Sequence, residues 1–141
     1  MFNFTKKNKN LDNNKTSLFS KTASILIHAA KMDESYTKNE KEIIKKTLID
    51  LGVNSEEINK IMIEAEENEK NSNQILDFTK ELKKADQDFK IKLVESLWKI
   101  IYSDAKSDMF EDNLMRRLTG LLYFDKKMVG DIKEKIKKNL L

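Results

Sequence analysis

A polar segment flanked by apolar runs occurs twice in this chain and limits the folds open to it. Asp33 and Glu40 bound the first segment, and Asp104 and Glu111 bound the second with the same spacing, 71 positions later. Positions around the two segments also match in type at this offset: Leu26 with Leu97, Ile27 with Trp98, Ile43 with Leu114, Leu51 with Leu122 and Ile58 with Val129. An ungapped match of this kind is typical of internal duplication. The sequence therefore predicts two copies of one unit.

The apolar runs repeat with the period of an α-helix, and almost nothing in the chain would interrupt a helix. Proline is absent and glycine occurs three times in 141 residues, and these two residue types disfavour helices most. We expect helices at about residues 17–32, 37–52, 56–70, 73–84, 86–103, 108–122 and 125–140. The predicted fold class is all-α, a seven-helix, internally duplicated bundle. The first and fifth helices should lie at its centre because they carry the longest apolar runs.

Capping residues predict where several helices begin and end. Thr37 followed three residues later by Glu40 has the spacing of a capping box, in which each side chain binds a backbone N–H of the other residue. Gly52 follows the second helix, where a left-handed residue would end it. Asn54 or Ser55 is then expected to cap the third helix. The later helices have their own expected caps: Asp86 or Gln87, Asp108 and Asp125.

We expect one helical domain at residues 16–141, preceded by a disordered polar arm at residues 1–15. The arm could instead hold the protein peripherally at a membrane, because apolar and basic side chains adjoin near its start: Phe2, Phe4, Lys6 and Lys7. No apolar run approaches the ~18 residues of a membrane-spanning helix. The chain has no cysteine, which removes disulfides and thiolate metal sites. We therefore expect a cytoplasmic protein.

Charge and isolated side chains favour structural over functional interpretations. The net charge of +3 is too small to predict nucleic-acid binding. His28, the only histidine, is expected on a helix flank; the alternative is a general base or a metal ligand. Trp98 lies inside an apolar period and is expected in the core, the alternative being a stacking platform. Arg116 and Arg117 could bind an anion, but pairing with surface carboxylates accounts for them. The acidic run at residues 64–69 is expected on a solvated face.

The repeated carboxylates are the main candidates for chemistry. If the two units pack about a pseudo-twofold axis, Asp33, Glu40, Asp104 and Glu111 could form an oxygen-only site for Ca²⁺, Mg²⁺ or Mn²⁺. A structural interpretation also exists, because the capping box accounts for the glutamates and turns commonly use aspartate. A third interpretation is hydrolysis by paired carboxylates, although no nucleophile or phosphate-binding loop accompanies them.

The residues around both segments resemble a known family. Leu97-Trp98-Lys99-Ile100-Ile101-Tyr102-Ser103-Asp104, followed by Glu111-Asp112 and Leu114-Met115-Arg116-Arg117-Leu118, is similar to the second half of the TerB-like tellurite-resistance family. Ala29-Ala30-Lys31-Met32-Asp33 with Glu40 is similar to its first hinge, and the resemblance covers about Ser17 to Ile136. It implies an all-helical, duplicated domain whose acidic hinge residues are proposed metal ligands. On the matched motifs these would be Asp33, Glu40, Asp104 and Glu111. A related domain in a membrane-anchored co-chaperone implies a stress-response role exerted by binding.

These observations predict a non-enzymatic binding or scaffold protein of the tellurite-resistance or stress-response type. It would act on a protein partner that the sequence does not identify, with the help of a divalent cation. The alternative is a metal-dependent hydrolase that uses the same carboxylates. The two predictions differ in whether the four carboxylates meet in an open cleft or lie on helix caps.

Overall fold

The computed structural model describes residues 18–31, 36–71, 76–103 and 109–140, except for the side chains of residues 76–78, 109–112 and 140. Every regular element in these ranges is a helix. The first helix occupies residues 18–30, and it is followed by α2 (Lys38–Asp50), α3 (Ile58–Asn71), α4 (Leu76–Leu82), α5 (Gln87–Tyr102), α6 (Met109–Leu121) and α7 (Lys126–Leu140). The all-α class and the expected number of helices are thus confirmed for the described residues.

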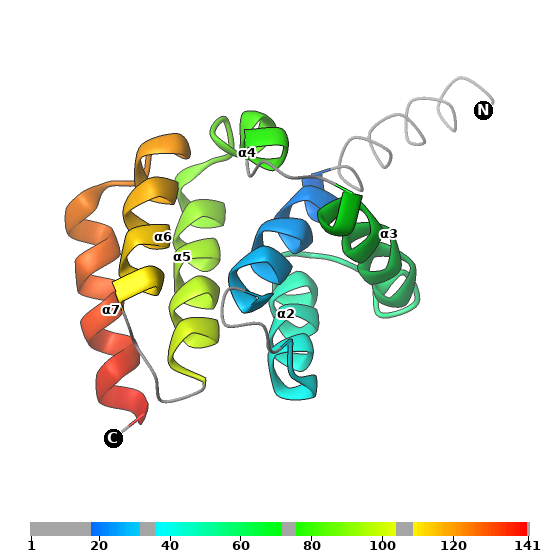
Figure 1. The fold of residues 1–141 in the computed structure, drawn as a ribbon, viewed down its shortest axis with the longest axis horizontal. Helices are drawn as coiled ribbons and strands as arrows, with labels where there is room; N and C mark the ends of the chain where they lie inside the picture. The colour runs from blue at the N-terminus through cyan, green and yellow to red at the C-terminus, as the bar shows by residue number, and fades with distance from the viewer. Residues whose placement is uncertain (1–17, 32–35, 72–75, 104–108, 141) are drawn as a thin grey trace.

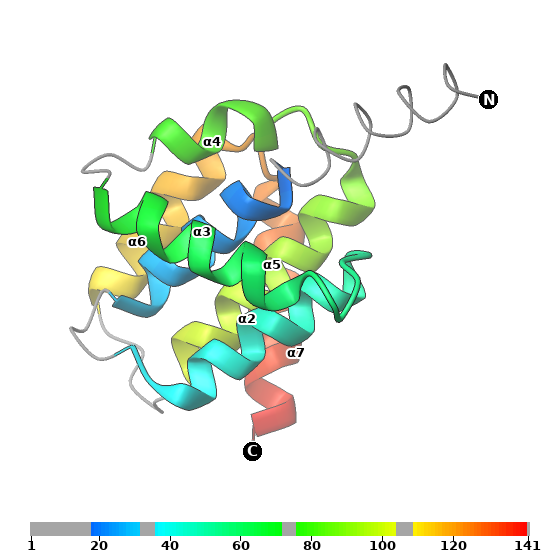
Figure 2. The same ribbon diagram turned by 90° about the vertical axis from the view of Figure 1, so that its right-hand side faces the viewer.

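The helices form two groups of three that lie side by side, with α4 across one end (Figure 1). The first group contains the first helix, α2 and α3, and the second contains α5, α6 and α7. Helix α5 packs against α7 within its own group and against α2 of the other group. Seen from the side of α3, the first helix lies behind α3 and α5 lies deeper still (Figure 2). The two helices expected at the centre therefore do lie there.

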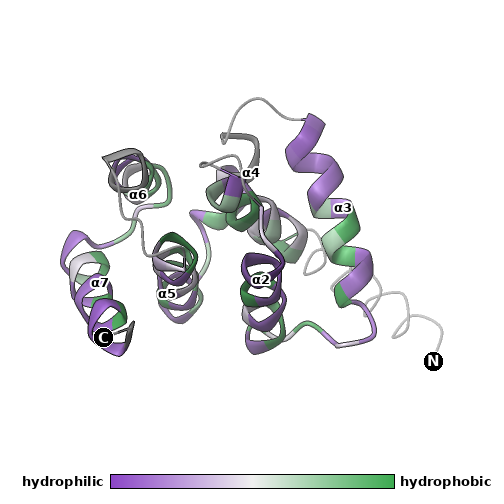
Figure 3. Cartoon of the chain, turned by 60° about the horizontal axis from the view of Figure 1, so that its bottom comes forward, coloured by the Kyte–Doolittle hydropathy of each residue, from purple (hydrophilic) through white to green (hydrophobic). Residues whose placement is uncertain are grey.

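The first helix is enclosed almost completely. From Ser20 to Ala30 every side chain is buried except Lys21 and His28, which are partly exposed. Two of its buried hydroxyls bond within the helix, because Thr22 Oγ1 donates to the Leu18 carbonyl at 2.7 Å and Ser24 Oγ lies 3.0 Å from the Ser20 carbonyl. In the hydropathy view, hydrophobic residues gather where the helices face one another and hydrophilic ones cover their outer sides (Figure 3).

A pair of hydroxyl groups joins the two groups of helices. Thr47 Oγ1 on α2 and Ser96 Oγ on α5 are 2.6 Å apart and buried. Thr47 also donates to the Ile43 carbonyl at 2.8 Å, which makes Ser96 the donor in the shared bond. This buried bond joins α2 to α5, and Lys92 Nζ of α5 donates to the Asp50 carbonyl of α2 at 3.2 Å nearer the surface.

The predicted ends of α2 are confirmed. Thr37 is its N-cap, and the reciprocal bonds of a capping box join Thr37 and Glu40. At the other end Val53 N–H donates to the Leu48 carbonyl and Gly52 N–H to the Ile49 carbonyl, which is the hydrogen-bond pattern of a Schellman motif. Gly52 has φ +116°, so the glycine is required there by backbone conformation.

Helix α6 ends in the same way but without a glycine. Phe124 N–H donates to the Thr119 carbonyl at 3.0 Å, and Tyr123 holds φ at 55°. Tyr123 stands 71 positions after Gly52. A left-handed conformation costs a residue with a side chain roughly 1–2 kcal/mol, and this tyrosine is 69% exposed, so burial of the ring does not explain it.

The start of α3 differs from the expectation. Asn54 or Ser55 was the expected cap, but Glu57 N–H donates to the Asn54 carbonyl at 2.9 Å and closes a turn first. The helix then begins at Ile58. The predicted caps Asp86 and Asp125 are confirmed, since Asp86 Oδ1 accepts from Phe89 N–H at 2.8 Å and Asp125 Oδ1 from Lys127 N–H at 3.3 Å.

The internal duplication stays a prediction. Helices α2 and α6 begin and end at positions that differ by 71, but α7 begins at Lys126, before the counterpart of Ile58. The arm at residues 1–15 and the cap Asp108 lie outside the described residues. No helix in the described part of the chain is both long enough and apolar enough to cross a membrane.

Candidate functional site

The four predicted metal ligands fall mostly outside the described residues. Asp33 and Asp104 lie in ranges that the structure does not describe, and Glu111 lies in the first turn of α6 with its side chain undescribed. Glu40 alone can be placed. The structure therefore leaves the convergence of the four carboxylates as a prediction. Among the described residues no three His, Cys, Asp or Glu side chains lie close enough together to hold a metal ion.

The capping box holds the Glu40 carboxylate in place. Its Oε1 accepts from Thr37 N–H at 2.8 Å and from Thr37 Oγ1 at 3.0 Å, and the residue is 2% exposed. In return Glu40 N–H donates to Thr37 Oγ1 at 3.1 Å. Hydrogen bonding of this kind stabilises a buried carboxylate. The capping-box role predicted for Glu40 is thus confirmed. This role does not conflict with metal binding, because hard divalent cations prefer carboxylate oxygens as ligands.

Two carboxylates of α3, Glu66 and Glu69, lie near Tyr36 in the first hinge, which is the segment from Asp33 to Glu40. Tyr36 Oη donates to Glu66 Oε1 at 3.3 Å, and Lys41 Nζ lies 3.2 Å from the same oxygen. Burial, and then the negative charge of Glu66, raise the pKa of the Tyr36 phenol well above its usual range. Glu40 and Glu69 act in the same direction. Tyr36 is thus a neutral hydrogen-bond donor facing carboxylates.

Glu69 completes this network beside the first helix. Its carboxylate lies 2.8 Å from Lys31 Nζ and 3.5 Å from His28 Nδ1, and the Glu69 side chain is only 11% exposed. His28 therefore lies on a helix flank beside a carboxylate, in agreement with the structural expectation. The network as described joins α3 to the first helix through Lys31 and to α2 through Lys41.

The solvated face expected for the acidic run is wrong for two of its members. Glu64 and Glu67 are exposed, but Glu66 and Glu69 turn inward. Helical spacing contained the signal, because Glu66 and Glu69 lie four positions after Met62 and Ala65, which are buried. Side chains four apart share a face of a helix.

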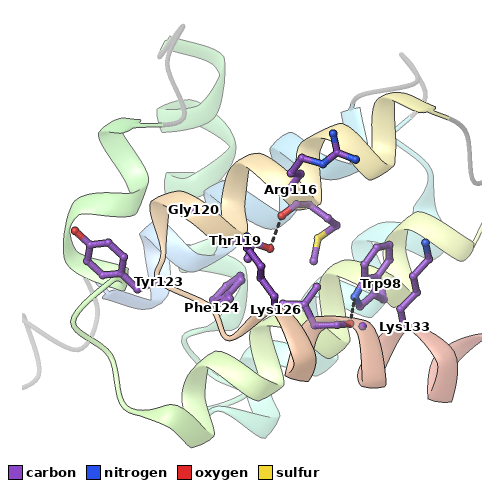
Figure 4. Close-up of a pocket in the computed structure, with 11 residues that line it drawn as sticks. Trp98, Arg116, Thr119, Gly120, Tyr123, Phe124, Lys126 and Lys133 are labelled. Atoms are coloured by element: carbon purple, nitrogen blue, oxygen red, sulfur yellow. Dashed lines mark hydrogen bonds between the residues drawn. The ribbon is translucent and has the colours of Figure 1, made fainter.

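A cavity of about 920 Å³ forms a groove between α6 and α7, which we call the α6–α7 groove. Helix α5 forms its floor through Trp98, and both walls add apolar side chains (Figure 4). These apolar residues are buried: Trp98, Met115, Phe124 and Val129. Sequence reasoning missed this site.

Trp98 belongs to the core as expected, and it also anchors α7. The indole is 3% exposed and its Nε1–H donates to the Val129 carbonyl at 3.1 Å (Figure 4). Lys133 Nζ lies 5.2 Å from the centre of the indole ring, within range of a cation–π contact. One turn along α5, Tyr102 stacks on Trp98 with ring centres 5.8 Å apart.

Cations line the groove. Arg116 on α6 and Lys126 and Lys133 on α7 are among its lining residues, and none of the described lining residues is a carboxylate. Neither Arg116 nor Arg117 forms an ion pair with a described residue, so the expected pairing with surface carboxylates is wrong within that part of the chain. An apolar floor with a cationic rim is suited to a ligand that is apolar on one side and anionic at its edges.

Residues 20–134 match a family model whose description is Tellurite resistance protein TerB. No curated protein and no solved structure matches the chain. The matched range includes the helices from the first to most of α7, both hinges and the α6–α7 groove.

Proposed function

The chain belongs to the TerB family of tellurite resistance proteins, and from this premise we propose that it is a non-enzymatic binding domain assisted by a divalent cation. One observation carries the proposal: the carboxylates of Glu40, Glu66 and Glu69 lie around Tyr36 at the first hinge, and two of them pair with Lys41 and Lys31. Three carboxylates against two paired lysines leave an excess of negative charge, which favours a cation over an anionic substrate. No specific observation favours the hydrolase alternative.

The proposed ligands are Asp33 and Glu40 at the first hinge and Asp104 and Glu111 at the second. Their donor atoms are all oxygens, which suits Ca²⁺, Mg²⁺ or Mn²⁺. Because Glu66 and Glu69 already pair with lysines, we assign them to the electrostatic surroundings and not to the ligand set. A bound cation would relieve repulsion among the hinge carboxylates and stabilise the native state.

Thermal unfolding in the presence of Ca²⁺, Mg²⁺ or Mn²⁺ tests this proposal. A cation at about a hundred times its Kd should stabilise the native state by roughly 3 kcal/mol, which raises Tm by several degrees. Asp33→Asn and Asp104→Asn should each remove the rise. Glu40→Gln keeps an acceptor for Thr37 N–H and should fold, but it should lose the response to cations.

Glu64→Gln is the matched control, because Glu64 is an exposed carboxylate outside the proposed set. It should respond to the cation as the wild type does. A wild-type Tm unmoved by millimolar Ca²⁺, Mg²⁺ and Mn²⁺ removes the cation from the proposal. Loss of the response in the Asp33 variant alone would show that one hinge suffices and would remove Asp104 and Glu111 from the site.

A further inference from the structure

The α6–α7 groove is open along its length. Both walls carry exposed residues: Arg116, Gly120 and Tyr123 at α6 and its end, and Lys126 and Gly130 on α7. Nothing lies within 4 Å of the position that a Cβ would take at either glycine. A small molecule lying here would keep one side in solvent, whereas small-molecule sites usually bury most of their ligand. The open shape thus favours a macromolecular ligand.

The dimensions suit a helix. Lys126 and Lys133 both line the groove, and their separation of seven positions on α7 corresponds to about 10.5 Å of helix axis. A helix of similar length places apolar side chains at i, i+4 and i+7 on one face. These side chains would contact the apolar floor between the two walls. A groove of this kind is a common receptor for an amphipathic helix.

The cations that line the groove indicate which type of helix it would bind. Among its described lining residues are Arg116, Lys126 and Lys133 and no carboxylate. Carboxylates that flank the apolar stripe of a docked helix would meet these cations, and the pairs would favour an acidic helix over a basic one. Nucleic acid fits less well, because the floor is apolar and three cations offer few contacts to a phosphate backbone.

Tyr123 adds an exposed aromatic at one end of the groove. Its left-handed conformation costs stability, and strained residues often serve binding. Tyrosine is enriched where proteins bind one another, because the ring provides contact area and the hydroxyl a polar end. Tyr123 also lies beside Lys83, whose Nζ is 6.0 Å from the ring centre.

We infer that the α6–α7 groove binds an acidic amphipathic helix of a partner protein, with apolar side chains over Trp98 and carboxylates at Arg116, Lys126 and Lys133. The inference rests on the proposed binding role, for which it names the chemistry of the partner, and it does not require the cation at the hinges. The helix and the cation occupy different parts of the molecule.

The test uses a fluorescein-labelled peptide of about 14 residues that places leucines at helical i, i+4 and i+7 spacing with glutamates on both flanks. Fluorescence anisotropy with the full chain should give saturable binding that weakens as NaCl is raised. A scrambled peptide of identical composition keeps the charge but has no apolar face. It should bind at least tenfold more weakly, and equal binding of the two peptides would overturn the inference.

Substitutions in the groove test whether the peptide binds there. Gly130→Leu fills the open space above the floor and should reduce affinity at least tenfold, while a leucine in place of a helical glycine favours the fold. Arg116→Gln should reduce affinity about threefold to fivefold. Arg117→Gln is its matched control, because the neighbouring arginine does not line the groove. Equal effects of the two arginine variants, or an unaffected Gly130→Leu, would place the peptide elsewhere.

Trp98 provides a local signal, since it is the single tryptophan of the chain. Its emission should change on titration with unlabelled peptide in the wild type and not in Gly130→Leu.

Three other results would contradict the inference. They are tighter binding to single-stranded DNA, groove-dependent binding to anionic vesicles without peptide binding, and dimerisation of the chain that Gly130→Leu abolishes.

Running the peptide titration in EDTA and again with Ca²⁺ separates this inference from the proposed function. Equal peptide affinity in the two buffers is expected. Peptide binding without a cation-dependent Tm rise would leave the helix site standing and remove the cation. A cation-dependent Tm rise without peptide binding would leave the cation site standing and remove the helix site. Peptide binding that requires Ca²⁺ would overturn the independence of the two sites.

Discussion

Helices α3 and α7 are the outer helices of their groups, and they attach to the centre in opposite ways. Helix α3 has four glutamates against two lysines, and α7 has six lysines against one aspartate and one glutamate. In Figure 1 the two helices lie at opposite sides of the molecule. The chain is close to neutral overall, but its two sides differ strongly in charge.

Helix α3 is held by ion pairs and a buried hydrogen bond. Glu69 pairs with Lys31 of the first helix, and Ser24 Oγ lies 3.1 Å from the Ala65 carbonyl. Both helices also bury apolar side chains, but the polar and charged groups of α7 contact aromatic rings. Trp98 donates to its backbone, and Lys133 and Lys137 lie 5.2 and 5.9 Å from the ring centres of Trp98 and Tyr102.

The comparison shows how two similar groups of helices can leave a small cavity on one side of the molecule and a large groove on the other. The glutamates that turn inward on α3 are neutralised by lysines there, and the cavity beside Tyr36 and Glu66 is about 320 Å³. On the other side the aromatic anchor leaves the α6–α7 groove of about 920 Å³ with cations along it. We therefore expect α3 to stabilise the fold and α7 to present a binding surface.

The largest effect should come from removing the anchor of α7. Trp98→Ala should lower the free energy of unfolding by roughly 3–5 kcal/mol, because the indole is buried and bonded to α7. Ile27→Ala, at the matched position of the first helix, should cost roughly 2–5 kcal/mol through packing alone. Urea unfolding measures both. A loss below about 1 kcal/mol for Trp98→Ala would place the indole at a surface and remove the anchor.

The helix ends at Gly52 and Tyr123 should respond with opposite signs. Gly52→Ala should destabilise by roughly 1–2 kcal/mol, because φ is +116° there. Tyr123→Gly should stabilise by about 0.5–1 kcal/mol, since glycine removes the strain and costs only chain entropy. Denaturant midpoints of the two variants check this. Destabilisation by Tyr123→Gly would mean that the ring makes contacts worth more than the strain.

Ion pairs and cation–π contacts should be separable by substitution. Glu69→Gln should cost about 1 kcal/mol, because the carboxylate is largely buried beside Lys31. Lys137→Gln should cost about 0.5 kcal/mol. The exposed Glu64→Gln serves as control and should change stability by less than about 0.5 kcal/mol. If Lys137→Gln costs more than Glu69→Gln, the assignment of the stabilising role to α3 is wrong.

The smallest effect concerns alkaline pH. Burial raises the pKa of Tyr36 in the native state, so in the unfolded state the phenol loses its proton first, near pH 10. The stabilising contribution is therefore complete below about pH 10 and declines as the pH rises further. Tyr36→Phe should flatten this decline relative to the wild type. Identical pH profiles of unfolding would show that the phenol titrates normally.

Local signals in the sequence sufficed for most of the fold. The Thr37–Glu40 pair, Gly52 and Asp86 each fix a helix end through bonds to adjacent backbone, and such bonds depend on neighbouring residues alone. The predicted start of α3 was wrong because it too was based on neighbouring residues alone. Asn54 and Ser55 are both good caps, but the chain completes a turn first and the helix begins at Ile58.

The candidate sites could be predicted less well. The 71-position offset places Tyr123 on Gly52, and this signal for a left-handed residue was not used. Helical spacing likewise contained a signal that Glu66 and Glu69 face inward, where we had expected a solvated face. The α6–α7 groove had no such signal, because it depends on how α6 and α7 pack around Trp98 of α5, and no local pattern contains that arrangement.

The position of α5 has a consequence for the autonomy of the two groups of helices. Because α5 packs on α7 and also on α2, and because Thr47 and Ser96 share a buried bond between the groups, neither group has a complete interior of its own. A chain cut at α4 would expose the apolar faces of α2 and α5 to water, and a unit of half this size has little stability to offset that exposure. We therefore expect the two groups to unfold as one cooperative unit, so that a perturbation that loosens either group loosens both.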